Sequence, residues 1–249
     1  MLSSPLEQFS ILKVIDLDLV FLDLSITSIS IYSFLTLIGL STLCRFVSEK
    51  NYFLFRSWVF IVNSTFKLIL NLLINNLGRF GIRYINLILT IFLVILVFNY
   101  LSLVPYSFTL TAHLATCLTL SITVWLGATV LGFYLNGLKF LAMFLPFNSP
   151  ASLVVPFILI ETLGYLVRPI SLGVRLAANL AAGRLLLALG SSFIYFLFSS
   201  SYITINLISI LPLALLIAFS YLEFAVALIQ TYVFSLLSIS YIHDAISPR

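Results

Sequence analysis

Long apolar runs dominate the chain from residue 25 onward. Three of them, 25–44, 84–104 and 114–135, have the length of one membrane-spanning helix, which needs about 20 apolar residues. Two further runs, 153–198 and 203–243, would each form about 60 Å of helix at a rise of ~1.5 Å per residue. Because that is about twice the hydrocarbon thickness, these two helices are predicted to be strongly inclined or kinked. The candidate kink sites are Pro156, Pro169 and Pro212.

The stretch between the first two runs has a different pattern. Lys67, Asn71 and Asn75 recur every fourth residue among apolar neighbours, which gives a helix one polar face. This predicts an amphipathic helix within 50–80 that lies in the plane of the membrane interface. A surface helix of a soluble protein would show the same pattern, but the flanking apolar runs favour the membrane.

The amino-acid composition also indicates a membrane protein. Hydrophobic residues make up 62% of the 249 residues and charged residues 8%, whereas soluble domains carry about 25% charged residues. We therefore predict an all-α polytopic membrane protein, with an N-terminal arm (1–24) and a single membrane domain (25–249). Basic residues nowhere cluster densely, so nucleic acid is not an expected partner. Cys44 and Cys117 lie in apolar runs and are expected to be small buried side chains.

The placement of charge orients the chain. One predicted side carries Arg45, Lys50, Arg56, Lys67, Arg79, Arg83, Lys139 and Arg249. The opposite side has the loops 105–113 and 199–202, which hold no formal charge, and a mostly acidic N-terminal arm. The positive-inside rule then predicts five spans, with the N-terminus outside and the C-terminus inside. The first residues do not resemble a secretory signal. Removal of a short leader before Ser4 or Pro5 stays open.

Ionisable residues interrupt the last two apolar runs. They are Glu161, Arg168, Arg175, Arg184, Glu223 and Asp244. A charge at the centre of a spanning helix costs about 2.5–3.5 kcal/mol even on the lenient insertion scale, and it usually marks an ion or proton pathway. If the two runs form an antiparallel hairpin with its tip at 199–202, three polar layers follow. The predicted layers are Glu161 with Asp244, Arg175 with Gln230, and Arg184 with Glu223.

Helical periodicity separates the two central arginines. At 100° per residue Arg184 lies opposite Arg175. The Arg175 face also carries small residues, namely Gly164, Ser171, Ala178 and Ala182. Small residues allow another helix to approach closely in a membrane. We therefore expect Arg175 to point at a close-packed partner, with Arg184 pointing elsewhere, toward Glu223. An arginine stays charged where a lysine could lose its proton.

Two segments carry a family resemblance. They are ETLGYLVRPISLGVRLAANLAAGRLL at 161–186 and LEFAVALIQTYVFSLLSISYIHDAI at 222–246. Both resemble subunit a (subunit 6) of the F-type ATP synthase. Three shorter segments resemble the mitochondrial members, namely SPLEQF at 4–9, LVPYSFTLTAHL at 103–114 and SITVWLGATVLG at 121–132. The resemblance covers nearly the whole chain and is weakest across 45–83.

The resemblance implies roles for individual residues. Arg175 matches the essential arginine that faces the ring of c subunits and separates two proton half-channels. Glu223 matches the acid of the half-channel open to the intermembrane space. Glu161 and Asp244 match acids of the matrix half-channel. Asn179 and Gln230 match polar lining residues near the arginine.

Position 184 departs from the family. Mitochondrial relatives usually have histidine there, whereas this chain has Arg184. Histidine titrates near pH 6.5 and relays protons, and arginine does not. We expect Arg184 to be a fixed partner that keeps Glu223 ionised. Glu223 and ordered water would then carry protons on the intermembrane side.

The resemblance also implies partners and a location. They are the c-ring, the peripheral stalk and other Fo subunits, membrane lipid and contacts in an ATP synthase dimer, in the mitochondrial inner membrane. No nucleotide-binding glycine loop is present, so we expect no ATP binding, no catalysis by the chain itself and no cofactor, with protons as the transported ion. An unrelated transporter and a respiratory-complex subunit are the alternative functions.

Five residues also have structural explanations. Glu161 lies near a predicted helix start, where a carboxylate suits the helix dipole. Arg168 could satisfy the carbonyl that Pro169 frees, or reach lipid headgroups. His113 could be an interfacial residue without a proton role. Asn179 could join two helices, and Asp244 could be solvated at the inner surface.

Overall fold

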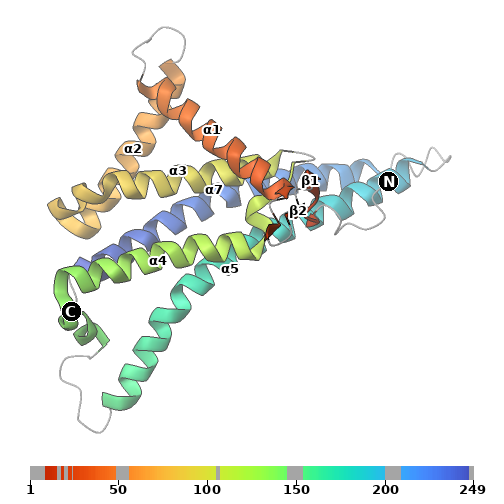
Figure 1. Cartoon of the computed structure of the whole chain (residues 1–249). Helices are drawn as coiled ribbons and strands as arrows, with labels where there is room; N and C mark the ends of the chain where they lie inside the picture. The colour runs from red at the N-terminus through yellow and green to blue at the C-terminus, as the bar shows by residue number, and fades with distance from the viewer. Residues whose placement is uncertain are drawn as a thin grey trace.

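The structure is a computed structural model of the whole chain, and it consists mainly of long helices (Figure 1). It describes residues 9–15, 18–19, 22–23, 25–48, 56–104, 107–144, 154–199 and 209–246. The predicted leader and the predicted hairpin tip beyond Ser199 lie outside these residues.

The observed helices follow the predicted apolar runs. They are α1 (Ser28–Ser48), α2 (Arg56–Leu77), α3 (Ile85–Leu103), α4 (Leu114–Asn136), α5 (Val154–Phe198) and α7 (Ile210–Ile246). Short 3-10 helices, η2 (Gly78–Tyr84), η3 (Leu110–Ala112) and η4 (Gly137–Phe144), flank α3 and α4. The predicted run from residue 203 therefore begins as a described helix only at Ile210.

Four described helical stretches are long and apolar enough to cross a membrane. They are Gly81–Leu103, Leu114–Phe144, Val154–Phe198 and Ile210–Ile246. The predicted first span corresponds to α1, whose described apolar stretch Ser28–Thr42 is shorter than a full crossing. The all-α polytopic fold is confirmed, and the crossing by α1 stays a prediction.

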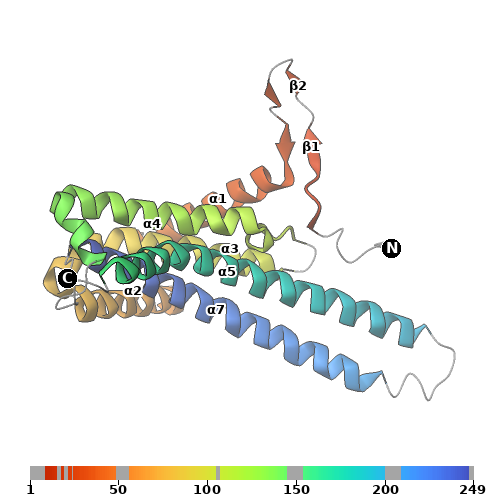
Figure 2. The ribbon, with the colours of Figure 1, turned by 90° about the horizontal axis from the view of Figure 1, so that it is seen from below.

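Helices α3, α4, α5 and α7 form the bundle. Figures 1 and 2 show α5 and α7 running side by side and continuing together beyond the ends of α3 and α4. At its other end α5 slants away from α4 (Figure 1). Of the three predicted kink sites, only Pro169 lies inside a helix. Pro156 and Pro212 stand in the first turns of α5 and α7, where proline costs no hydrogen bond, so their predicted kinks were wrong.

The predicted amphipathic helix is α2. Ile69 and Leu73 are fully buried against α3 and the end of α7, whereas Lys67, Asn71 and Asn75 are exposed. The fourfold spacing of the polar residues therefore marks the face of α2 that the bundle leaves uncovered.

Buried amides join helices that are distant in sequence. Asn99 of α3 donates through Nδ2 to the carbonyl oxygen of Ala227 and to Oγ1 of Thr231 in α7. Asn136 at the end of α4 donates to the carbonyl oxygen of Ala245. Interhelical hydrogen bonds of this kind stabilise membrane bundles by about 0.6–2 kcal/mol each.

Helices α4 and α5 approach each other closely at a glycine. A Cβ on Gly173 would lie 2.7 Å from Oγ of Ser121 and 3.0 Å from the carbonyl oxygen of Cys117. Leu172 and Leu176, on either side of this contact, are fully buried. The packing between α4 and α5 therefore depends on the close approach of their two backbones as well as on large buried side chains. Cys117 itself is fully buried, as predicted.

Two short strand pairs in the N-terminal arm were not predicted. β1 (Lys13–Ile15) pairs antiparallel with β4 (Ile26–Thr27), and β2 (Asp18–Leu19) pairs with β3 (Leu22–Asp23). Val14, Ile15, Ile26 and Thr27 are β-branched residues that suit strands. Their runs are too short for the periodicity to reveal pairing.

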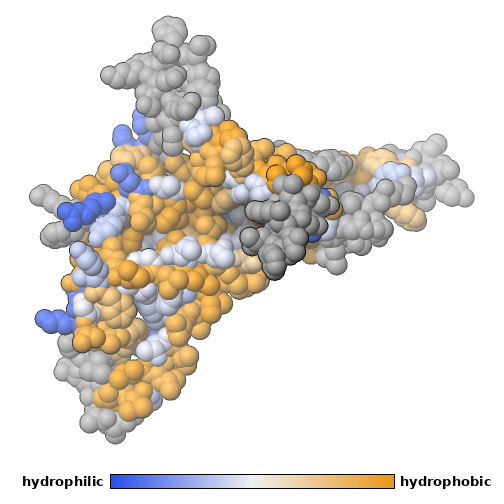
Figure 3. All heavy atoms as spheres, in the orientation of Figure 1, coloured by the Kyte–Doolittle hydropathy of each residue, from blue (hydrophilic) through white to orange (hydrophobic). Residues whose placement is uncertain are grey.

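The face of the molecule seen in Figure 3 is mostly hydrophobic. Its hydrophilic side chains gather mainly along the edge formed by α2, η2 and η4. Lys67, Arg83 and Lys139 are exposed in the α2, η2 and η4 segments there. These three basic residues therefore share one side, as the predicted orientation requires.

Gly173→Ala is expected to destabilise the α4–α5 contact by about 1–3 kcal/mol, because the added methyl group meets backbone. Gly127→Ala is the matched control, since nothing lies within 4 Å of its Cβ position. The thermal midpoint of unfolding of the purified protein measures the difference. Equal midpoints for the two variants would contradict the close packing at Gly173.

Candidate functional site

Arg175 stands at the middle of α5 on a face that the rest of the chain leaves open. Its side chain is exposed and forms no hydrogen bond or ion pair with the described residues. The small residues of that face are exposed as well, namely Gly164, Ser171, Ala178 and Ala182. The predicted uncovered face of small residues around Arg175 is therefore present.

A groove between α5 and α7 lies beside Arg175. It has a volume of about 240 Å³ and is lined by Arg168, Ser171, Arg175, Val233, Leu236, Leu237 and Tyr241. The hydroxyl of Tyr241 is buried without a hydrogen-bond partner in the described structure. A water molecule occupies about 30 Å³ of liquid, so the groove has room for several.

One turn beyond Arg175, two amides bridge the helices. Asn179 of α5 donates through Nδ2 to Oε1 of buried Gln230 in α7, at 3.4 Å. Nε2 of Gln230 is buried without a partner. The bridge leaves hydrogen-bonding capacity unused next to the arginine. Asn179 thus joins two helices, as its structural explanation predicted. Gln230 contacts the residue one turn beyond Arg175, so it lies close to the layer that was predicted for it with Arg175.

Glu223 of α7 is buried at the next level. Its residue exposure is 7%, and Oε1 has no hydrogen-bond partner. The carboxylate packs on Gly183 of α5, where an added Cβ would lie 2.9 Å from Oε1. Glycine at 183 therefore makes the space that the carboxylate occupies.

Arg184 follows Gly183 and ties α5 to the end of α3. Its Nη2 donates to the carbonyl oxygen of Val104 at 3.1 Å and to Oγ of Ser107 at 3.2 Å. Glu223 is the acid whose charge acts on Arg184, but no ion pair within 4.0 Å joins these two residues. Arg184 and Glu223 lie at one level, as predicted, and a backbone carbonyl and a hydroxyl hold the guanidinium.

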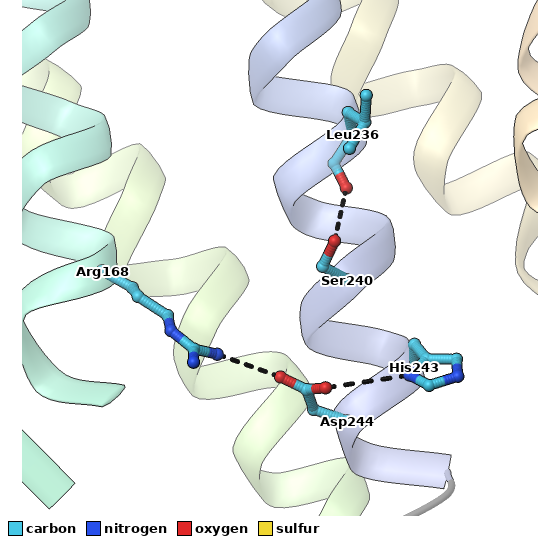
Figure 4. A network of polar contacts seen from close by, with 5 residues as sticks. All are labelled: Arg168, Leu236, Ser240, His243 and Asp244. Carbon is cyan, nitrogen blue, oxygen red and sulfur yellow. Dashed lines mark hydrogen bonds and ion pairs between the residues drawn. The ribbon is translucent and has the colours of Figure 1, made fainter. Parts of the chain in front are cut away.

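At the other end of the helix pair a charged network appears (Figure 4). Arg168 of α5 donates through Nη1 to Oδ2 of Asp244 in α7, at 3.1 Å. Nδ1 of His243 lies 3.7 Å from Oδ1 of the same carboxylate. Asp244 is therefore paired rather than merely solvated. Arg168 pairs with an acid, which neither structural explanation for it anticipated.

Glu161 does not join this network. It is exposed and forms no hydrogen bond or ion pair with the described residues. Glu161 and Asp244, which were predicted to share a layer, do not contact each other, because Asp244 pairs with Arg168, which follows Glu161 by about 10 Å of helix. The described hydrogen-bond partner of Gln230 is Asn179, one turn beyond Arg175.

The direction of helical side chains explains these shifts. Side chains lean toward the N-terminus of their own helix. In an antiparallel pair the side chains of the two helices therefore lean in opposite directions along the axis. Two side chains that meet can then belong to Cα atoms at different depths. The offset is largest for the long Arg168 and smallest at Gly183, which has no side chain. The assumption of equal depth therefore predicted the level of Glu223, but it did not predict that Asp244 pairs with Arg168.

Three further polar residues belong to the site region and were not predicted. Asn99 reaches Thr231, next to Gln230, and its Oδ1 is buried without a partner. Ser107 accepts from Arg184, and Tyr241 lines the groove. A lone polar residue in an apolar run, as Asn99 is, was the available signal. Among the described residues no cluster of His, Cys, Asp and Glu could hold a metal ion.

Comparisons with known proteins support one family. The family profile described as ATP synthase A chain matches residues 29–243. ATP synthase subunit a of Candida parapsilosis is 41% identical, with 99% of each chain covered. The subunit of Pichia angusta is 38% identical over 98% of this chain and 97% of the relative. That of Saccharomyces cerevisiae is 36% identical over 98% and 96%. The chain therefore belongs to the ATP synthase A chain family.

Proposed function

We propose that this chain is the stationary proton-conducting subunit of the Fo motor of an ATP synthase. Protons reach the carboxylates of a rotating ring of c subunits through one aqueous half-channel and leave through a second, offset one. Arg175 separates the two paths, so proton flow turns the ring and drives ATP synthesis. The chain itself carries no catalytic site and needs no cofactor. Its place is the mitochondrial inner membrane, which it crosses several times.

The unpaired charge of Arg175 carries this proposal. An exposed guanidinium at the middle of a spanning helix is costly in lipid. Within the described chain nothing compensates it, so the compensating group comes from a neighbour. The surrounding small residues let a helix of that neighbour approach. A neighbour with a carboxylate at the same depth meets both requirements, and a fixed positive charge also repels protons that would pass straight through.

The intermembrane-side path is proposed to pass Glu223. Its carboxylate is buried, faces Gly183 and keeps one oxygen without a partner. A buried carboxyl group in this state can bind and release a proton. Gln230 and Asn179 lie between Glu223 and Arg175 along the helix pair and offer polar lining.

The matrix-side path is proposed to run along the groove beside Arg175 toward Asp244, with Glu161 exposed further along the same face. The groove volume and the unpartnered hydroxyl of Tyr241 support water at this place. The three exposed basic residues near this end support placing it, and the C-terminus, on the matrix side. The N-terminus then lies in the intermembrane space.

The partners proposed beyond the c-ring are the peripheral stalk, other Fo subunits and membrane lipid. The apolar outer faces of α5 and α7 support such neighbours, because both helices extend past α3 and α4 (Figure 2). Contacts between two ATP synthases in a dimer belong to the same proposal.

Arg175→Ala is expected to abolish ATP-driven proton pumping while the complex still assembles, because the barrier between the half-channels is lost. Proton flux in inverted membrane vesicles with verified assembly measures this. Arg83→Ala, a change at an exposed arginine outside the bundle core, is the matched control. Normal coupled pumping by the Arg175 variant would refute the proposal and favour an unrelated transporter.

Glu223→Gln is expected to lower coupled proton flux at least about tenfold, equivalent to ~1.4 kcal/mol, because the amide cannot release a proton. Arg184→His is expected to retain flux, since the guanidinium is a fixed group there. Rates of ATP synthesis in energised vesicles measure both variants. Loss of flux in Arg184→His with normal assembly would contradict the fixed role of Arg184.

A further inference from the structure

A second polar cluster lies where α1, α3, α4 and α5 meet, at the end of the bundle opposite to Asp244. It is built on the turn η3 between α3 and α4 (Figure 1). Thr109 and Thr111 are only 3% and 1% exposed. Ser28 begins α1, which packs on the same turn. Hydroxyl groups buried this completely normally have hydrogen-bond partners.

These buried groups have no partner within the described chain. The atoms concerned are Oγ1 of Thr109, Oγ1 of Thr111, Nε2 of His113 and Oγ of Ser28. A buried polar group that makes no hydrogen bond destabilises the folded protein. Three such groups at the η3 turn, those of Thr109, Thr111 and His113, point to bound water, which needs two to four polar partners.

His113 is held in place at this cluster. Its ring stacks on Phe108 with the centroids 5.0 Å apart. Its carbonyl oxygen accepts from the backbone N–H of Cys117 and from Oγ1 of Thr116. Burial lowers the pKa of the imidazole, so at neutral pH the ring is uncharged and has one donor and one acceptor nitrogen.

Short contacts link His113 to the Glu223 level. Ser107, next to Phe108, accepts from Arg184, and Arg184 follows the glycine on which Glu223 packs. Tyr32 of α1 lies on Phe108 with the centroids 5.9 Å apart. The ionisable groups that the elements around the cluster bring to this end are Tyr32, Tyr100, Cys117, Arg184 and Glu223.

The sequence contains two histidines, and they lie at opposite ends of the bundle. His243 belongs to the Asp244 network. The position expected to hold a relaying histidine is occupied by Arg184, whose Nη2 is hydrogen-bonded to Val104 and Ser107. Within this chain His113 is therefore the only imidazole on the Glu223 side.

We propose that His113, with the hydroxyls of Thr109 and Thr111, forms a water-binding mouth that passes protons from the intermembrane side toward Glu223. One ring nitrogen takes a proton from a hydronium ion. The other releases its proton to a water molecule on the Glu223 side, so the ring returns to the neutral state. This rests on the proposed function and adds a proton-relay residue to its intermembrane-side path.

The test uses the assembled complex in membrane vesicles. His113→Gln is expected to lower coupled proton flux several-fold with normal assembly, because the amide does not titrate. In His113→Ala, imidazole added on the intermembrane side is expected to restore part of the flux. Thr109→Val and Thr111→Val are expected to lower flux as well. Thr119→Val and Thr123→Val are the controls, since those hydroxyls bond only to carbonyls of their own helix.

Two results would overturn the inference. Wild-type flux in His113→Gln would do so, and so would reduced flux that imidazole fails to restore in His113→Ala, since that indicates a structural role. If Arg175→Ala still abolishes pumping in the same vesicles, the proposed function stands and only the role of His113 fails. Normal pumping by both His113→Gln and Arg175→Ala would refute the proposed function as well.

Discussion

The arrangement depends on the charge of Arg175. This arginine lies at the middle of the long helix α5, and among the described residues none forms a hydrogen bond or an ion pair with its side chain. Two other arginines of α5 are satisfied inside the chain, Arg168 by Asp244 and Arg184 by Val104 and Ser107. Since a charge in lipid costs several kcal/mol, the open face of α5 is where the proposed partner would supply the compensating group.

Close packing on the other side of α5 makes this open face possible. Gly173 brings the helix backbone against α4, while Leu172 and Leu176 fill the core. A helix that packs against the bundle along one side can carry small residues on its opposite side, even if that opposite side packs against nothing else in the chain. The anchoring also sets which way Arg175 points, because Leu172, Leu176 and Arg175 are fixed relative to one another by helical periodicity.

Much of this architecture could be predicted from apolar run lengths. The bounds of α3, α4 and α5 agree with the prediction within one residue at each end, because hydrocarbon thickness dictates the length of an apolar segment. Individual pairings were less predictable. Asp244 meets Arg168 because long side chains lean along the helix axis, and Asn99 finds Thr231 at a separation of 132 residues. Neither the local sequence pattern nor the assumption that paired residues lie at equal depth predicts these two contacts.

A fixed cation at position 184 has consequences for its surroundings. The guanidinium of Arg184, bound to the carbonyl of Val104, brings the end of α3 to α5, but it cannot give up its proton. In the proposed function, proton exchange at this end would rest on groups that change charge near neutral pH, and carboxyl and imidazole groups are the candidates. Glu223 supplies the first beside Gly183. The turn that Arg184 contacts through Ser107 continues to His113, which supplies the second. Two tasks are thus separated in the proposed function, since Arg184 joins the helices while Glu223 and His113 would carry the proton.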